Sequence, residues 1–196
     1  LAPKLGLKQQ MMAQDSLGQT SLSKVTFVAK GVVLYTLLIE LIGVIILSTS
    51  FIPMYGVGRG LYYSIFYSIS AFNNAGFSLF DNSLINFQSH YLICLTISML
   101  YTLGGIGFLV LIDIKQNKKW SKLTPNSKLI LSTILVLNLI AFILIWLLES
   151  NNPLTLGPMT LGEQAMNSWF QATVPRSSGF NTINTSAMEH STALLT

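Results

Sequence analysis

Three long apolar segments constrain this chain more than any other feature of its sequence. They cover residues 25–47, 91–112 and 129–148, and each reaches the length of about 20 helical residues that crosses a bilayer. Hydrophobic residues make up 51% of the 196 residues and charged residues only 9%, against about 25% charged in ordinary soluble domains. Because a segment in lipid has to satisfy its own backbone hydrogen bonds, we predict an all-α membrane protein.

Lysines gather at two places along the chain and predict its orientation. One group precedes or opens the first apolar segment, and the other fills residues 113–128, "DIKQNKKWSKLTPNSK". Lysine near the ends of a span favours the cytoplasmic side, so an even number of crossings has to separate the two groups. The apolar stretch at residues 58–72 is too short to span comfortably. We therefore predict that it enters from the outer face and returns to it.

The stretch "AFNNAGF" follows this short segment and interrupts its apolar character. A re-entrant turn cannot leave unpaired backbone groups facing lipid, so it has to line water or ions. The helix is expected to stop at Asn73, Asn74 and Ala75, and Gly76 permits a close approach that other residues resist. A helix that ends inside the membrane directs the negative end of its dipole there, which favours a cation. The alternative is a glycine-capped interfacial helix after an ordinary loop.

The order of these features repeats about 103 residues later. Each copy has a lysine, an apolar span, an outer loop, a short aromatic helix, a polar turn and a Gly-Phe pair, with Gly179 in the place of Gly76. Both first spans run outward from the cytoplasm, which predicts parallel copies around an axis along the membrane normal. Backbone carbonyls that face such an axis can replace the hydration shell of a monovalent cation. We therefore predict helix–re-entrant pore loop–helix repeats arranged around a central ion pore.

Three motifs in this chain resemble a known family. The stretch "SAFNNAGFSLF" resembles the second pore loop of the Trk/Ktr/HKT superfamily of potassium transporters, and "VPRSSGFNT" resembles the third. The stretch "LGGIGFLVL" resembles the glycine-rich second helix of the second repeat in that superfamily. The likeness is greatest to the KtrB-like membrane subunits and covers essentially the whole chain. It implies four units around one pore, of which this chain holds the second and part of the third.

The resemblance also implies which residues form the selectivity filter, since each unit contributes one glycine and its neighbours. In this chain the main-chain carbonyls would come from Asn73, Asn74, Ala75, Gly76, Arg176, Ser177, Ser178 and Gly179. The family often has Thr-Ala where this chain has two serines before the second glycine, a change that leaves the glycine in place. The transported ion would be K+, with Na+ as an alternative, and no covalently bound cofactor is implied.

On this interpretation the chain divides into four parts. They are a cytoplasmic amphipathic connection at 1–24, a complete helix–pore loop–helix repeat at 25–112, a basic cytoplasmic loop at 113–127 and a partial second repeat at 128–196. The first and fourth units and the closing helix of the third would then be missing. We therefore expect a fragment of a longer transporter, unable to conduct ions alone.

The family likeness further implies partners and a location. The full-length subunit would be a multi-pass homodimer in the plasma membrane of a bacterium, in contact with membrane lipid. A cytosolic nucleotide-binding subunit of the KtrA/TrkA kind would regulate it. The net charge of +4 comes from cytoplasmic loops rather than from a surface of interleaved basic and aromatic residues, so no nucleic-acid partner is expected.

An enzymatic function is not expected. The sequence has no paired intramembrane acids, no histidine-rich ligand spacing, no nucleophile with a histidine base and no phosphate-binding glycine loop. Glu40, within the first apolar segment, is either a functional residue or a packing residue bonded to a neighbouring helix. A sodium or mixed monovalent cation transporter and a non-conducting membrane assembly module remain as alternative functions.

Two other features have both a structural and a functional interpretation. Gly104, Gly105 and Gly107 allow helices to approach closely, and a hinge is the alternative. Arg176 either pairs with an acidic group such as Glu163 or positions ions beside the filter.

Overall fold

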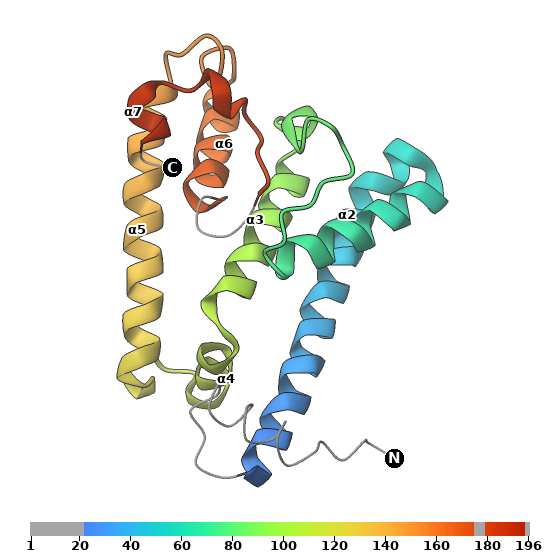
Figure 1. The fold of residues 1–196 in the computed structure, drawn as a ribbon, viewed down its shortest axis with the longest axis vertical. Helices are drawn as coiled ribbons and strands as arrows, with labels where there is room; N and C mark the ends of the chain where they lie inside the picture. Colours follow the sequence, from blue (N-terminus) through green and yellow to red (C-terminus); the bar gives the residue numbers. More distant parts are fainter. Residues whose placement is uncertain (1–21, 175–178, 195–196) are drawn as a thin grey trace. The chain divides into compact units, whose positions relative to one another are not determined.

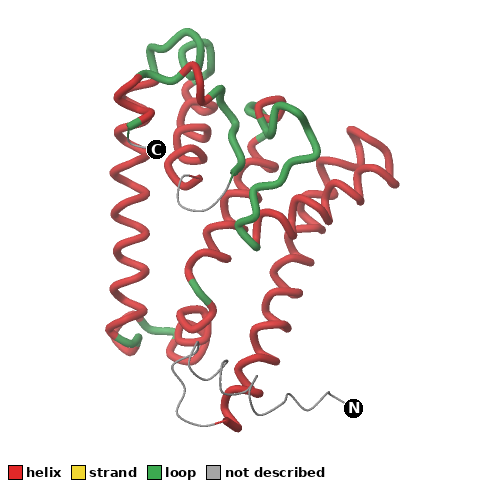
Figure 2. The backbone as a smooth tube through the Cα atoms, viewed as in Figure 1, coloured by secondary structure: helices red, strands yellow, loops and turns green. Residues whose placement is uncertain are grey.

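The computed structural model describes residues 22–174 and 179–194, and these residues form helices joined by loops (Figure 1, Figure 2). The helices are α2 (Leu22–Phe72), α3 (Tyr91–Ile106), α4 (Phe108–Asn117), α5 (Pro125–Glu149), α6 (Leu161–Thr173) and α7 (His190–Ala193). Short 3-10 turns lie at Ile85–Phe87, Trp120–Lys122 and Thr185–Ala187. The part of the chain that the structure describes contains no β-strand, and the prediction of an all-α protein is confirmed.

The chain divides into two compact units, Leu1–Ile39 and Glu40–Thr196, and the boundary lies within α2. The described part of the first unit is the helix at residues 22–39. Several of its apolar side chains are exposed, among them Val33, Leu34 and Leu37. Such a surface suits a helix in contact with lipid rather than water.

In the second unit, α2 consists of two helices that meet at Gly56, where the backbone is not helical (φ 79°, ψ 167°). The later helix folds back on the earlier one, so that the Phe51 and Tyr63 rings lie 6.1 Å apart (Figure 1). Gly60 permits this approach, because a Cβ atom there would lie 2.6 Å from Ile52 Cα. The short helix predicted to return toward the outer face is therefore a separate helix that doubles back on the span before it.

The apolar segment expected as one span at residues 91–112 is bent. α3 ends at Ile106 and α4 begins at Phe108, and their axes differ by 92° (Figure 2). Gly107, between them, has a φ of 91°, which residues with a side chain rarely adopt. The segment thus differs from a single straight helix. With 16 residues, α3 is shorter than the about 20 that cross a bilayer.

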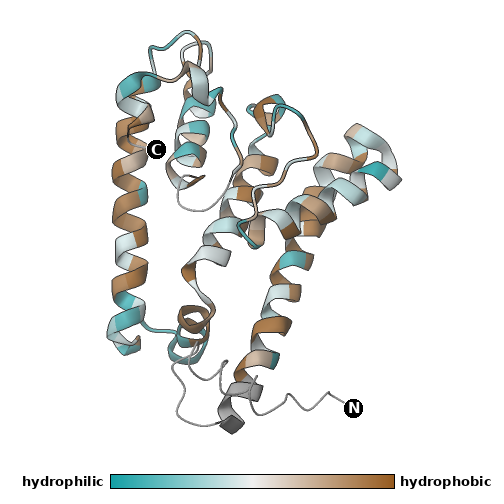
Figure 3. Ribbon diagram, viewed as in Figure 1, coloured by the Kyte–Doolittle hydropathy of each residue, from teal (hydrophilic) through white to brown (hydrophobic). Residues whose placement is uncertain are grey.

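α5 has the length and composition that the third predicted span requires, with 25 residues and the apolar character of a membrane helix (Figure 3). Pro125 occupies its first turn, and the Thr124 hydroxyl caps it by accepting a hydrogen bond from Ser127 N. The Asp113 carboxylate accepts two hydrogen bonds from Thr124, at 2.9 Å from the main chain and 2.7 Å from the hydroxyl. These bonds connect the middle of α4 to the beginning of α5.

α6 is the second short helix that the repeat predicted, and it lies beside α5 and α3 (Figure 1). Thr160 and Glu163 form a capping box at its beginning. The Trp146 indole of α5 donates to Gln164 Oε1 at 3.3 Å. These contacts hold a 13-residue helix that is too short to cross a bilayer by itself.

Candidate ion-binding site

The first polar turn begins where the second helix of α2 ends, at Phe72. Ala75 N donates to Ser70 O at 2.9 Å and closes the last turn of that helix. Asn74 and Gly76 then adopt positive φ values of 53° and 69°. Asparagine and glycine are the residue types that enter this left-handed region most readily. The sequence "NNAG" thus has the residues that this backbone path requires.

Two hydroxyl groups of the same helix hold the segment after the glycine in place. Ser70 Oγ donates to Phe77 O at 2.9 Å. The Tyr67 hydroxyl lies 2.8 Å from Ser78 Oγ and accepts from Leu79 N at 3.1 Å. Neither Ser70 nor Tyr67 was predicted from the sequence to hold this segment. The only indication of such a role in the sequence is that each places a polar group on an otherwise apolar helix.

Glu40 provides a buried acceptor for the first residue of the turn. Its Oε1 accepts from Asn73 Nδ2 at 2.8 Å, and its main-chain oxygen accepts from Ser68 Oγ at 2.7 Å. The carboxylate is therefore bonded within its own unit rather than isolated in the apolar segment. Glu40 is thus the hydrogen-bonded packing residue of the second interpretation, and its partner Asn73 is a predicted filter residue.

The two glycines of the repeat lie directly against each other. A Cβ atom on Gly179 would be 3.3 Å from Gly76 O and 3.6 Å from Gly76 Cα. The segments that follow the glycines also pair, since Leu84 N donates to Asn181 O at 3.0 Å and Asn181 N donates to Ser83 Oγ at 3.1 Å. Gly76 and the segment that begins at Gly179 thus lie together in the structure, although they are distant in sequence.

The structure describes five of the eight predicted filter residues, namely Asn73, Asn74, Ala75, Gly76 and Gly179. Arg176, Ser177 and Ser178 lie outside the described residues, and so does the expected pairing of Arg176 with Glu163.

Glu163 itself has hydrogen-bond partners at the beginning of α6. Its Oε2 accepts from Thr160 N at 2.9 Å and from the Thr160 hydroxyl at 2.8 Å. Hydrogen bonds from the Ser89 hydroxyl and from Thr160 lower the pKa of the Glu163 carboxyl below its ordinary value. This acidic group serves the capping of α6.

Gly104 of α3 lies against the end of the first short helix. A Cβ atom there would lie 1.8 Å from Phe72 O, and at Gly105 the nearest atom would be Asn74 Nδ2 at 3.8 Å. Close approach is thus required at Gly104 and only ordinary contact occurs at Gly105. The prediction that this glycine cluster allows close helix packing is confirmed at Gly104.

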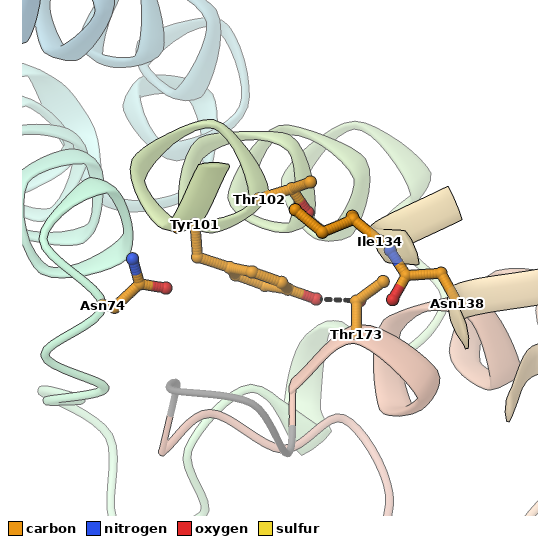
Figure 4. Close-up of a pocket in the computed structure, with 7 residues that line it drawn as sticks. Asn74, Tyr101, Thr102, Ile134, Asn138 and Thr173 are labelled. Carbon is orange, nitrogen blue, oxygen red and sulfur yellow. Dashed lines mark hydrogen bonds between the residues drawn. The ribbon is translucent and has the colours of Figure 1, made fainter. Parts of the chain in front are cut away.

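A cavity of about 290 Å³ with both polar and apolar lining groups lies beside Asn74 (Figure 4). Its lining comes from the polar turn, α3, α5 and the end of α6: Asn74, Tyr101, Thr102, Gly105, Ile134, Asn138 and Thr173. The Tyr101 hydroxyl shares a hydrogen bond with Thr173 and donates to Phe170 O at 3.2 Å. The cavity therefore lies near the carboxyl ends of both short helices, where their dipoles are negative.

Side chains that could bind a metal ion do not cluster in the part of the chain that is described. No group of three or more His, Cys, Asp or Glu there could hold a metal ion.

Two short helices, the second half of α2 and α6, pack beside longer apolar helices, and the first of them ends in a polar turn at Asn73–Gly76. The class of protein that this arrangement defines is an all-α membrane protein. The chain belongs to the TrkH family of cation transport proteins, which its sequence matches over residues 3–196. The family predicted from the three motifs is therefore confirmed.

Relatives within this family include proteins named for potassium uptake. Ktr system potassium uptake protein B of Bacillus subtilis is 39% identical over 196 residues, which are 100% of this chain and 44% of that protein. The protein of the same name from Vibrio alginolyticus is 37% identical over 185 residues, 92% of this chain and 40% of the relative. Potassium/sodium uptake protein NtpJ of Enterococcus hirae is 33% identical over 193 residues, 98% of this chain and 43% of the relative. The chain thus spans less than half the length of these relatives.

Proposed function

We propose that this chain is part of the pore-forming subunit of a potassium uptake transporter. The observation that carries the proposal is the contact between Gly76 and Gly179, each of which follows a short helix in the sequence. In the transporter, main-chain carbonyls of Asn73–Gly76 and of 176–179 line one half of a selectivity filter. Further units of the same polypeptide supply the other half.

The proposed mechanism is passive ion selection by backbone oxygens. Carbonyl groups at the two turns replace part of the hydration shell of K+ as the ion enters. The carboxyl ends of the two short helices lower the energy of a cation there, because their dipoles are negative at that end. K+ is the cargo of this process, and the chemistry requires no covalently bound cofactor.

The membrane setting and the assembly are parts of the same proposal. The exposed apolar side chains of α5, such as Leu135, Val136 and Leu147, contact lipid in the plasma membrane. The basic connection between α4 and α5 lies on the cytoplasmic side. A homodimer of the full-length subunit and a cytosolic nucleotide-binding subunit complete the transporter, and the name "Ktr system" of two relatives supports a multi-component assembly.

Transport of Na+, alone or with K+, is the second candidate function. The Enterococcus hirae relative is named a potassium/sodium uptake protein. A filter with a single glycine in each unit offers few coordinating layers, so modest changes in its walls shift the preference between the two ions.

Ion uptake by cells that lack their own potassium uptake systems tests the proposal. Cells expressing the full-length protein should grow at limiting K+ and accumulate K+ faster than Na+. Faster or equal uptake of Na+ would favour the second candidate. Membrane insertion without uptake of either ion would favour the non-conducting assembly module and overturn the transporter proposal.

Substitution of Glu40 should separate its charge from its role as an acceptor. We expect Glu40→Leu to lower K+ uptake about tenfold, because the loss of a buried acceptor releases the Asn73 side chain at the start of the turn. Glu40→Gln retains an oxygen at the same place and should keep most of the uptake. Initial rates at limiting K+, normalised to membrane abundance, provide the measurement. Normal uptake by the leucine variant would contradict the positioning role.

A further inference from the structure

Asn138 is a polar residue in the apolar middle of α5 that the pore loops do not explain. It is 4% exposed, so it does not reach the surface that α5 offers to lipid. Its side-chain oxygen Oδ1 has no hydrogen-bond partner among the described residues. A buried amide oxygen is unfavourable without a hydrogen-bond donor, so this group is suited to a ligand that can donate a hydrogen bond.

The cavity beside Asn74 provides the space for such a ligand. In Figure 4 the Asn138 amide points from α5 toward Thr102 and Thr173, which line the same cavity. The volume of about 290 Å³ exceeds the about 30 Å³ that one water molecule occupies in the liquid. The lining combines hydroxyl and amide groups, and a buried water typically makes about three hydrogen bonds to such groups.

Asn74 connects this cavity to the polar turn. It lines the cavity and also belongs to the turn, two residues before Gly76, with a φ of 53°. The side chain of Asn74 lies against α3 near Gly104 and Gly105, within 3.1 Å and 3.8 Å of the positions that their Cβ atoms would take. A change in the cavity contents therefore reaches the turn through one side chain.

We propose that the cavity is a site for ordered water, that Asn138 Oδ1 accepts a hydrogen bond from this water, and that the water positions Asn74. Asn138 is then a positioning residue for the ion site, although it lies on the helix of the neighbouring repeat. The proposal that water occupies the cavity does not depend on whether the protein transports ions. The effect on ion preference rests on the proposed function.

Hydroxyl-radical labelling of the full-length protein in lipid nanodiscs tests the hydration directly. Tyr101 is 3% exposed and lines the cavity, so its oxidation reports internal water. Tyr67 is the matched control, because it is fully buried and packs between Phe51 and Phe80. We expect label on Tyr101 and none on Tyr67 in the wild-type protein, and loss of the Tyr101 label in Asn138→Leu. Absence of label on wild-type Tyr101 would overturn the proposal.

Ion uptake by the same variants tests the positioning role. Asn138→Leu should change the ratio of the KM values for K+ and Na+ about tenfold at normal membrane abundance. Asn138→Ser retains an oxygen and should keep both the ratio and the Tyr101 label. Leu137→Ala, at an exposed neighbouring position of α5, should leave both unchanged. A wild-type ratio in Asn138→Leu would overturn the link between the cavity and the ion site.

A second variant keeps the test decisive if Asn138→Leu does not accumulate in the membrane. Thr102→Val replaces a cavity hydroxyl by a methyl group of similar size. It should reduce the Tyr101 label and shift the KM ratio in the same direction, and a wild-type result in both measurements would overturn the proposal. If the wild-type protein transports neither ion, the proposed function fails, while the labelling still decides whether the cavity contains water.

Discussion

Replacement of Gly76 by serine is expected to reduce the preference for K+ over Na+ at least about tenfold in the full-length protein. Gly76 has a φ of 69°, in a region that residues with a side chain rarely occupy. Its carbonyl oxygen also faces Gly179, whose Cβ position lies only 3.3 Å away. Serine therefore strains the turn and rotates the carbonyls that the proposal assigns to the filter. The ratio of K+ to Na+ uptake at limiting K+ is the measurement.

Gly56→Ser is the matched control for this substitution. Gly56 also has a positive φ, 79°, but a Cβ atom there would meet no atom within 4 Å. The control variant should lose about 1–3 kcal/mol of stability through backbone strain and keep the wild-type ion preference. Unchanged preference in Gly76→Ser at normal abundance would remove residues 73–77 from the ion path. An equal change in both variants would assign the effect to backbone strain in general.

Replacement of Gly104 by alanine is expected to reduce K+ uptake at least about tenfold, even though only one methyl group is added. The new Cβ atom would lie 1.8 Å from Phe72 O. Phe72 O is a backbone atom, so no side-chain rotation relieves the overlap, and either α3 or the end of the first short helix has to move. The turn at Asn73–Gly76 begins at that helix end. Its geometry should change with the displacement.

Gly105→Ala provides the control on the same helix. Its Cβ atom would be 3.8 Å from Asn74 Nδ2, an ordinary van der Waals distance. The loss of uptake in this variant should be much smaller than in Gly104→Ala. Comparison of uptake with membrane abundance separates a displaced turn from failed insertion. Similar activity of the two alanine variants would contradict the close packing at Gly104.

Local features of this chain were predictable because they depend on neighbouring residues. The span in α5 follows from the length of its apolar run, and its beginning follows from Thr124 and Pro125 as cap and first helical residue. The short helix before Asn73 follows from its length and from the lysine pattern. The position of the joint at Gly56 was not predicted, because Gly56, Gly58 and Gly60 lie close together and the sequence does not show at which of them the chain bends.

The bend between α3 and α4 was likewise not predicted from the sequence alone. The three glycines of "LGGIG" indicated either close packing or a hinge, and the sequence does not distinguish among them. The structure assigns the close approach to Gly104 and the change of direction to Gly107, whose φ is 91°. Which glycine serves which purpose depends on the neighbour that each one meets. That neighbour, the carbonyl of Phe72, belongs to another helix.

The sequence by itself determined the all-α membrane class, the repeated polar turns and the family, because apolar length, lysine placement and short motifs are properties of contiguous residues. Only the tertiary structure decided that Gly76 meets Gly179, that Glu40 bonds to Asn73 and that Asn138 lines a cavity. Helical hydrogen bonds join residues four apart, so their pattern is encoded locally. Contacts between distant residues depend on how side chains pack between helices, and no local pattern specifies which distant residues will meet.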